Sequence, residues 1–128
     1  MSLYLSPLAG SDLGDTLDDL AEVDDRDIAR ITAAIARIAT RARNGHLSRQ
    51  HTQLLLASIG GSPDGLDLVG ALGLLIADLT TNNPALDELT DDARKDAERH
   101  GQEAALILQH DDLRRAASDA CESLDHTN

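Results

Sequence analysis

The chain has 128 residues and a formal net charge of −12, from 23 acidic and 11 basic residues. A negative field of this size repels nucleic acids and anionic membranes at long range. The only aromatic residue is Tyr4, which excludes base-stacking platforms and aromatic cages. The apolar residues are mainly Leu, Ile and Ala, and Leu and Ala are strong helix formers, so the composition favours an all-α fold.

The same sequence features bear on location. Cys121 is the only cysteine, which excludes an internal disulfide. Residues 1–11 carry no basic residue and no long apolar run, so no signal peptide is predicted. The longest apolar stretch, residues 68–77, is too short to span a bilayer. We therefore expect a cytoplasmic protein that does not enter a membrane.

The chain is predicted to comprise an N-terminal arm at residues 1–11 and a single helical domain at residues 12–125. The arm is expected to be extended, with leucines able to dock on another surface (Leu3, Leu5 and Leu8). Residues 12–25 are densely acidic but contain leucines at helical spacing (Leu13, Leu17 and Leu20). This spacing predicts a short amphipathic helix.

Residues 25–43 show the clearest helical pattern. Apolar residues recur there at alternating steps of three and four (Ile28, Ile31, Ile35, Ile38 and Ala42), which predicts an amphipathic helix with one apolar stripe. Asn44 and Gly45 are predicted to end this helix with a left-handed cap. A second helix is predicted to begin after Ser48 as N-cap and to stop at Gly60–Gly61.

The next helix is predicted at about residues 64–81, opened by Ser62, Pro63 and Asp64. Apolar residues occupy nearly every side of it (Leu66, Leu68, Val69, Leu72, Leu74, Leu75, Ile76 and Leu79). A helix that is apolar on all sides is expected to be buried on all sides. The sequence therefore predicts a compact bundle of five to six helices with this fully apolar helix at its centre.

The C-terminal region carries two apolar stripes on roughly opposite helix faces. The first runs from Leu86 to Leu108 and the second from Leu113 to Leu124. Either one long helix lies between two partners, or the helix breaks near His110, and the pattern leaves both open. The stripe from Ile28 to Ala42 and this switched C-terminal stripe offer more apolar face than one small bundle can cover, which predicts a homodimer through one of them.

Arginines dominate residues 26–51, where Asp27 is the only acidic residue. On a helical wheel four of them form a row away from the isoleucine stripe (Arg26, Arg30, Arg37 and Arg41). Like charges four residues apart repel, so the row gains from a negative counterpart. The row is expected to lie against the acidic stretch 12–25, from the same chain or a second subunit. The alternatives are a solvated arginine face and contact with phosphate.

Residues 26–59 have the outline of a helix-turn-helix. The second helix opens with side chains of the types that read base edges. The candidate contacts to a protein partner or to DNA are Arg26, Arg30, Arg37, Arg41, Arg43, Arg49, Gln50 and Gln53.

No group of residues predicts catalysis. Asp96, His100 and Glu103 have helical spacing that suits a divalent metal, but the second Glu-x-x-His unit of a helical di-metal site is missing. Ser48 and His51 can meet on one helical turn but have no carboxylate to orient the histidine. We therefore predict no catalytic residue, no bound metal and no cofactor.

The predicted function is a non-enzymatic helical interaction module that binds a protein partner or itself. The first alternative is a DNA-binding transcriptional regulator that uses the helix-turn-helix-like segment at residues 26–59. Further alternatives are an acidic mimic of nucleic acid and a small metal-binding enzyme.

Overall fold

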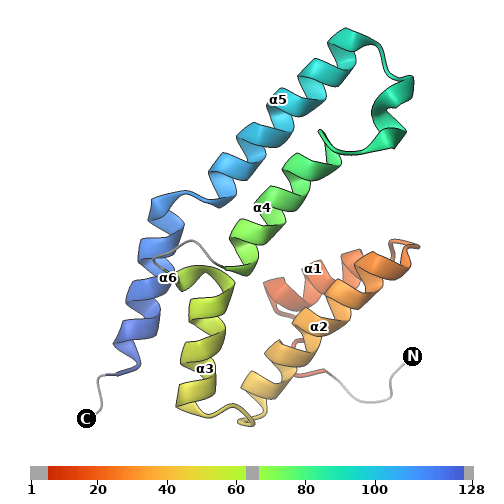
Figure 1. Cartoon of the computed structure of the whole chain (residues 1–128). Helices are drawn as coiled ribbons and strands as arrows, with labels where there is room; N and C mark the ends of the chain where they lie inside the picture. Colours follow the sequence, from red (N-terminus) through yellow and green to blue (C-terminus); the bar gives the residue numbers. More distant parts are fainter. Residues whose placement is uncertain (1–5, 63–66, 126–128) are drawn as a thin grey trace. The chain divides into compact units, whose positions relative to one another are not determined.

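The computed structural model describes residues 6–62 and 67–125, and all regular structure in these ranges is helical (Figure 1). The elements are α1 (Asp12–Ala21), α2 (Arg26–Arg43), α3 (Arg49–Leu56), the π-helical turn η1 (Ala57–Gly61), α4 (Leu68–Leu79), the 3-10 turn η2 (Pro84–Glu88), α5 (Asp91–Leu108) and α6 (Asp111–Ser123). The predicted all-α class is therefore confirmed. The helices group into two units, residues 1–48 and residues 49–128.

In the first unit, the chain turns back on itself before α1. Residues 7–10 form turns instead of the predicted extended arm, and Leu8 is buried. The backbone oxygen of Leu8 accepts a hydrogen bond from the Ser11 hydroxyl at 2.6 Å. The Ser11 hydroxyl oxygen in turn accepts from the Gly14 amide at 3.0 Å and caps α1. Leu3 and Leu5 lie outside the described residues.

Helix α2 presents three faces, about 120° apart at 100° per residue. Alanines and Thr32 face α1 and line a hollow together with Leu17 and Asp18 of that helix. The isoleucine stripe forms a second face, on which Ile31 and Ile35 are exposed, and the arginine row forms the third. Since α1 covers the face with small residues, Ile31 and Ile35 of the isoleucine stripe stay exposed, whereas Ile28 and Ile38 are half-buried.

The second unit is built on an antiparallel pair of helices, α4 and α5, which lie side by side (Figure 1). Glycines allow their backbones to approach closely. A Cβ atom on Gly73 would lie 3.2 Å from the backbone of Ala105, and one on Gly101 would clash with the Thr80 hydroxyl oxygen. Gly73 and Gly101 thus lie where α4 and α5 pack closely on each other.

Helix α6 lies against α3 and η1. Gly60 and Gly61 are buried, and a Cβ atom on Gly61 would lie 3.2 Å from the carbonyl carbon of Ala117. These glycines therefore allow a close helix contact. The helical segment that begins with α3 ends at Gly61, where the sequence predicted a stop, and its last turn is the wider η1.

The structure settles the question that the two C-terminal stripes left open. Helix α5 ends at Leu108, and α6 begins at Asp111 with His110 as its N-cap. The Nδ1 atom of His110 accepts from the Asp112 amide at 3.1 Å. The change of apolar face thus coincides with a break between two helices.

The prediction of a central helix buried on every side is not confirmed. Helix α4 begins at Leu68, capped by Asp67, whereas the predicted start at Pro63–Asp64 lies outside the described residues. Leucines on α4 remain exposed in the isolated chain (Leu68, Leu72, Leu74, Leu75 and Leu79). Among the described residues, none of the helices combines the length and the apolarity that a membrane crossing needs.

The contact between Gly101 and Thr80 gives a stability test. A glycine inside an exposed helix usually costs about 1 kcal/mol relative to alanine. Here Gly101→Ala is expected to destabilise the protein by about 2 kcal/mol, because the new methyl group clashes with Thr80 and forces α4 and α5 apart. Urea unfolding followed by circular dichroism measures the change.

The control is Gln102→Ala on the exposed side of the same helix, which should leave the midpoint within about 0.5 kcal/mol of wild type. A Gly101→Ala variant as stable as wild type would contradict the close packing of α4 on α5.

Candidate interaction surface

Helix α4 exposes a continuous row of leucines. Leu68, Leu72, Leu75 and Leu79, here called the leucine stripe, have exposed fractions of 58%, 45%, 46% and 53%. They follow one another at steps of four, three and four residues, the spacing of a heptad seam between packed helices. No charged side chain interrupts the row, so this face is suited to contact with another apolar helix.

The leucine stripe lies on the side of α4 that faces away from α5. At 100° per residue, its centre is roughly 150° from the face formed by Gly70, Gly73, Ala77 and Thr80, which packs on α5. Leu74 is also exposed, at 59%, but lies about 130° from the centre of the stripe. Leu74 is therefore a natural control position on the same helix.

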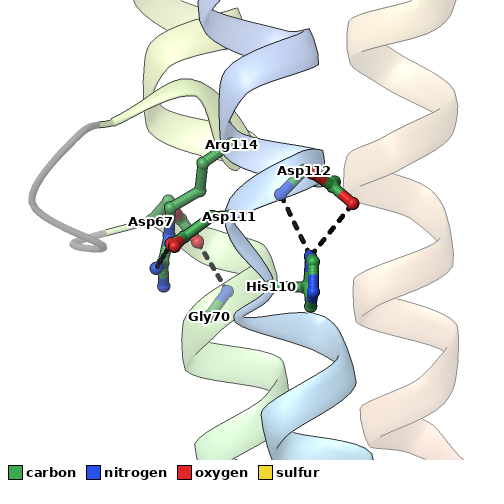
Figure 2. A network of polar contacts seen from close by, with 6 residues as sticks. All are labelled: Asp67, Gly70, His110, Asp111, Asp112 and Arg114. Carbon is green, nitrogen blue, oxygen red and sulfur yellow. Dashed lines mark hydrogen bonds and ion pairs between the residues drawn. The ribbon is translucent and has the colours of Figure 1, made fainter.

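A buried polar network fixes the start of α4 (Figure 2). The Asp67 carboxylate accepts a hydrogen bond from the Gly70 amide at 2.6 Å, and its side chain is only 2% exposed. Its other oxygen lies 3.5 Å from Nε of Arg114, whose Nη1 atom is 3.8 Å from Asp111. The network joins the N-terminus of α4 to the first turn of α6 and so helps to hold the direction of the leucine stripe.

Sequence reasoning did not assign a role to Asp67 or Arg114. The signal for Asp67 was present, because an acidic residue directly before an apolar run is a preferred N-cap. Arg114 gave no comparable signal, since its contact with Asp67 spans 47 residues of sequence.

We predict that Asp67→Ala lowers the free energy of unfolding by about 2 kcal/mol. The substitution removes a helix cap, worth about 1 kcal/mol, and leaves the guanidinium of Arg114, which is 20% exposed, without its buried partner. Asp67→Asn keeps a capping side chain and should recover about half of the loss.

Chemical unfolding of both variants checks this, with Asp119→Ala on the exposed face of α6 as a control. Equal stability of Asp67→Ala and wild type would show that the network does not hold α4.

The predicted partner or DNA contacts fall in both units. Arg26, Arg30, Arg37, Arg41 and Arg43 lie on α2 in the first unit, and Arg49, Gln50 and Gln53 lie on α3 in the second. Arg41 is half-buried, and the other arginines of this set are exposed. Within residues 6–62 and 67–125, each ion pair that the structure gives joins two side chains of the segment 67–115. The arginine row is therefore not paired with the acidic stretch 12–25.

Two of these side chains already have intramolecular partners. The Nη1 atom of Arg43 donates to the backbone oxygen of Pro7 at 2.9 Å. The Nε2 atom of Gln53 donates to the Asp125 carboxylate at 2.6 Å and to the Cys121 backbone oxygen at 3.3 Å. Gln53 therefore joins α3 to the end of α6 and is not presented as a free base-reading side chain.

The residues weighed as metal ligands do not converge. His100 Nδ1 lies 3.8 Å from the Glu103 carboxylate, whereas Asp96 pairs with Arg99 at 3.2 Å. In the part of the chain that the structure describes, no three His, Cys, Asp or Glu side chains come close enough to share a metal ion. The Cys121 thiol is half-buried and donates to the Gln53 backbone oxygen at 3.4 Å.

No family model matches the sequence, and neither a curated protein nor a solved structure matches the chain.

Proposed function

We propose that this chain is a non-enzymatic helical interaction module that acts in the cytoplasm and binds protein, in the first place a second copy of itself. The observation that carries the proposal is the exposed leucine stripe on α4. In such an assembly α4 becomes the covered, central helix of a compact helical bundle.

The composition of the stripe supports a protein partner. Contiguous apolar surface on a small chain is a common mark of an interaction site. Tyr4 is the only aromatic residue of the chain, so the binding energy must come from aliphatic contacts. A helix that carries leucines at steps of three and four offers such contacts to another helix.

The free energy gained by burying the leucine stripe sets the expected affinity of the dimer. The exposed fractions of the leucine stripe add up to about two whole leucines per copy. Burial is worth about 1.5–3 kcal/mol for each leucine, so two copies together gain about 6–12 kcal/mol. Association costs about 4–15 kcal/mol in lost freedom. The gain and the cost are of similar size, so the proposed dimer is expected to be weak and to dissociate on dilution.

Light scattering with a concentration series tests the proposal. Wild type is expected to move from the monomer mass of 13.6 kDa towards twice that value as its concentration rises. Leu75→Lys should keep the mass at 13.6 kDa at every concentration, because it places a charge in the centre of the apolar contact. Circular dichroism checks that the variant remains helical.

The matched control is Leu74→Lys, which adds the same charge to the same helix away from the stripe and should dimerise like wild type. Added salt should strengthen the dimer, because each copy carries a net charge of −12 and screening weakens the repulsion between copies. A wild-type mass of 13.6 kDa throughout, or equal loss of dimer in both lysine variants, would refute the proposal.

A second candidate function is DNA binding by the arginine row of α2. The observation that favours it is that Arg26, Arg30 and Arg37 are exposed on one face of α2. The overall negative charge opposes this function.

Fluorescence anisotropy with a labelled mixed-sequence duplex at low salt tests this candidate. If the arginine row binds phosphate, the affinity for DNA should fall as salt is added, whereas the dimer should become stronger. The double variant Arg30→Ala/Arg37→Ala should not bind the duplex. Lys95→Ala, which removes an exposed positive charge on α5, is the control. Absence of binding at low salt would remove DNA binding from consideration.

A further inference from the structure

We infer that the two copies meet through α4 in an antiparallel, two-fold contact, with the leucine stripe of one copy packed against the leucine stripe of the other. This inference rests on the proposed self-association through the leucine stripe and adds the relative orientation of the two α4 helices. It commits to one occupant of the exposed stripe, a second copy of this chain.

The spacing of the stripe is the first argument. Its steps of four, three and four residues read the same in both directions along the helix. When two such helices run antiparallel, Leu68 meets the partner's Leu79 and Leu72 meets the partner's Leu75. Every leucine of the stripe then has a leucine opposite, and a two-fold axis passes between the central pairs. A surface that matches itself in this way is what an isologous dimer requires.

The charge beside the stripe is the second argument. Asp78 is exposed near the C-terminal end of α4. An antiparallel contact keeps the two Asp78 carboxylates at opposite ends of the helix pair, each away from the negative end of the partner's α4. A parallel contact would instead place the two Asp78 carboxylates at the same end, where they repel each other and the negative helix ends.

The packing inside the second unit is the third argument. The glycine-containing face of α4 is already occupied by α5, and the Val69 side chain lies towards Gly60 of η1. The leucine stripe is the side of α4 that these neighbours leave uncovered. The leucine stripe can therefore contact the α4 helix of a second copy along its full length.

Disulfide trapping between full-length chains tests the orientation. In a Cys121→Ser background, one chain carries Leu72→Cys and another, with a purification tag of different size, carries Leu75→Cys. Disulfides form only where Cβ atoms come to about 3.5–4.5 Å. We expect mild oxidation of the mixture to give about tenfold more of the mixed product than either variant gives with itself. Leu68→Cys with Leu79→Cys is the second pair, at the ends of the stripe.

Leu74→Cys is the matched control and should give little product with any of these variants. The orientation is overturned if Leu72→Cys and Leu75→Cys each link to their own kind as fast as the mixture does, because a parallel contact produces that pattern. It is also overturned if the sample has the mass of a dimer but neither pair links, because the copies then meet through another surface. A sample that stays at 13.6 kDa refutes the self-association itself, with the stripe left for a different protein helix or for another part of the same chain.

Discussion

The second unit depends on the close approach of α4 and α5. Their backbones come together at Gly73 and Gly101, where even a methyl group would collide with Ala105 or Thr80. A contact this tight has no room for large side chains, so the leucines of α4 are placed on its other sides. The small residues that bring the two helices together therefore leave the leucine stripe exposed among the residues that the structure describes.

In the first unit, too, small residues form the contact between two helices and large aliphatic residues lie on another face. Helix α1 packs on the face of α2 that carries alanines and Thr32, and the isoleucine stripe lies on another face. In both units the large aliphatic side chains are thus available for contacts beyond the helix pair. In a chain with one aromatic residue, these stripes hold much of the apolar surface that can stabilise an assembly.

Sequence patterns predicted the helices well because the signals for them are local. The isoleucine spacing gave α2, and Gly45, with a φ of +75°, ends that region as a left-handed residue. The patterns were less informative about burial. Leucines on all sides of α4 indicated a helix buried on all sides, but which face is covered depends on contacts such as those of Gly73 and Gly101, which lie 28 residues apart. The network of Asp67 and Arg114 was missed for the same reason, since it joins residues distant in the sequence.

The amide of Gln53 holds the end of α6 through the Cys121 carbonyl and the Asp125 carboxylate. Its attachment depends on the C-terminal end of that helix, because Cys121 lies in the last turn of α6 and Asp125 lies just beyond it. Fraying or proteolytic removal of this turn would return the amide to water and would loosen α3 together with it. The packing of α3 on α6 therefore depends in part on the polar contacts that follow from the C-terminal end of α6.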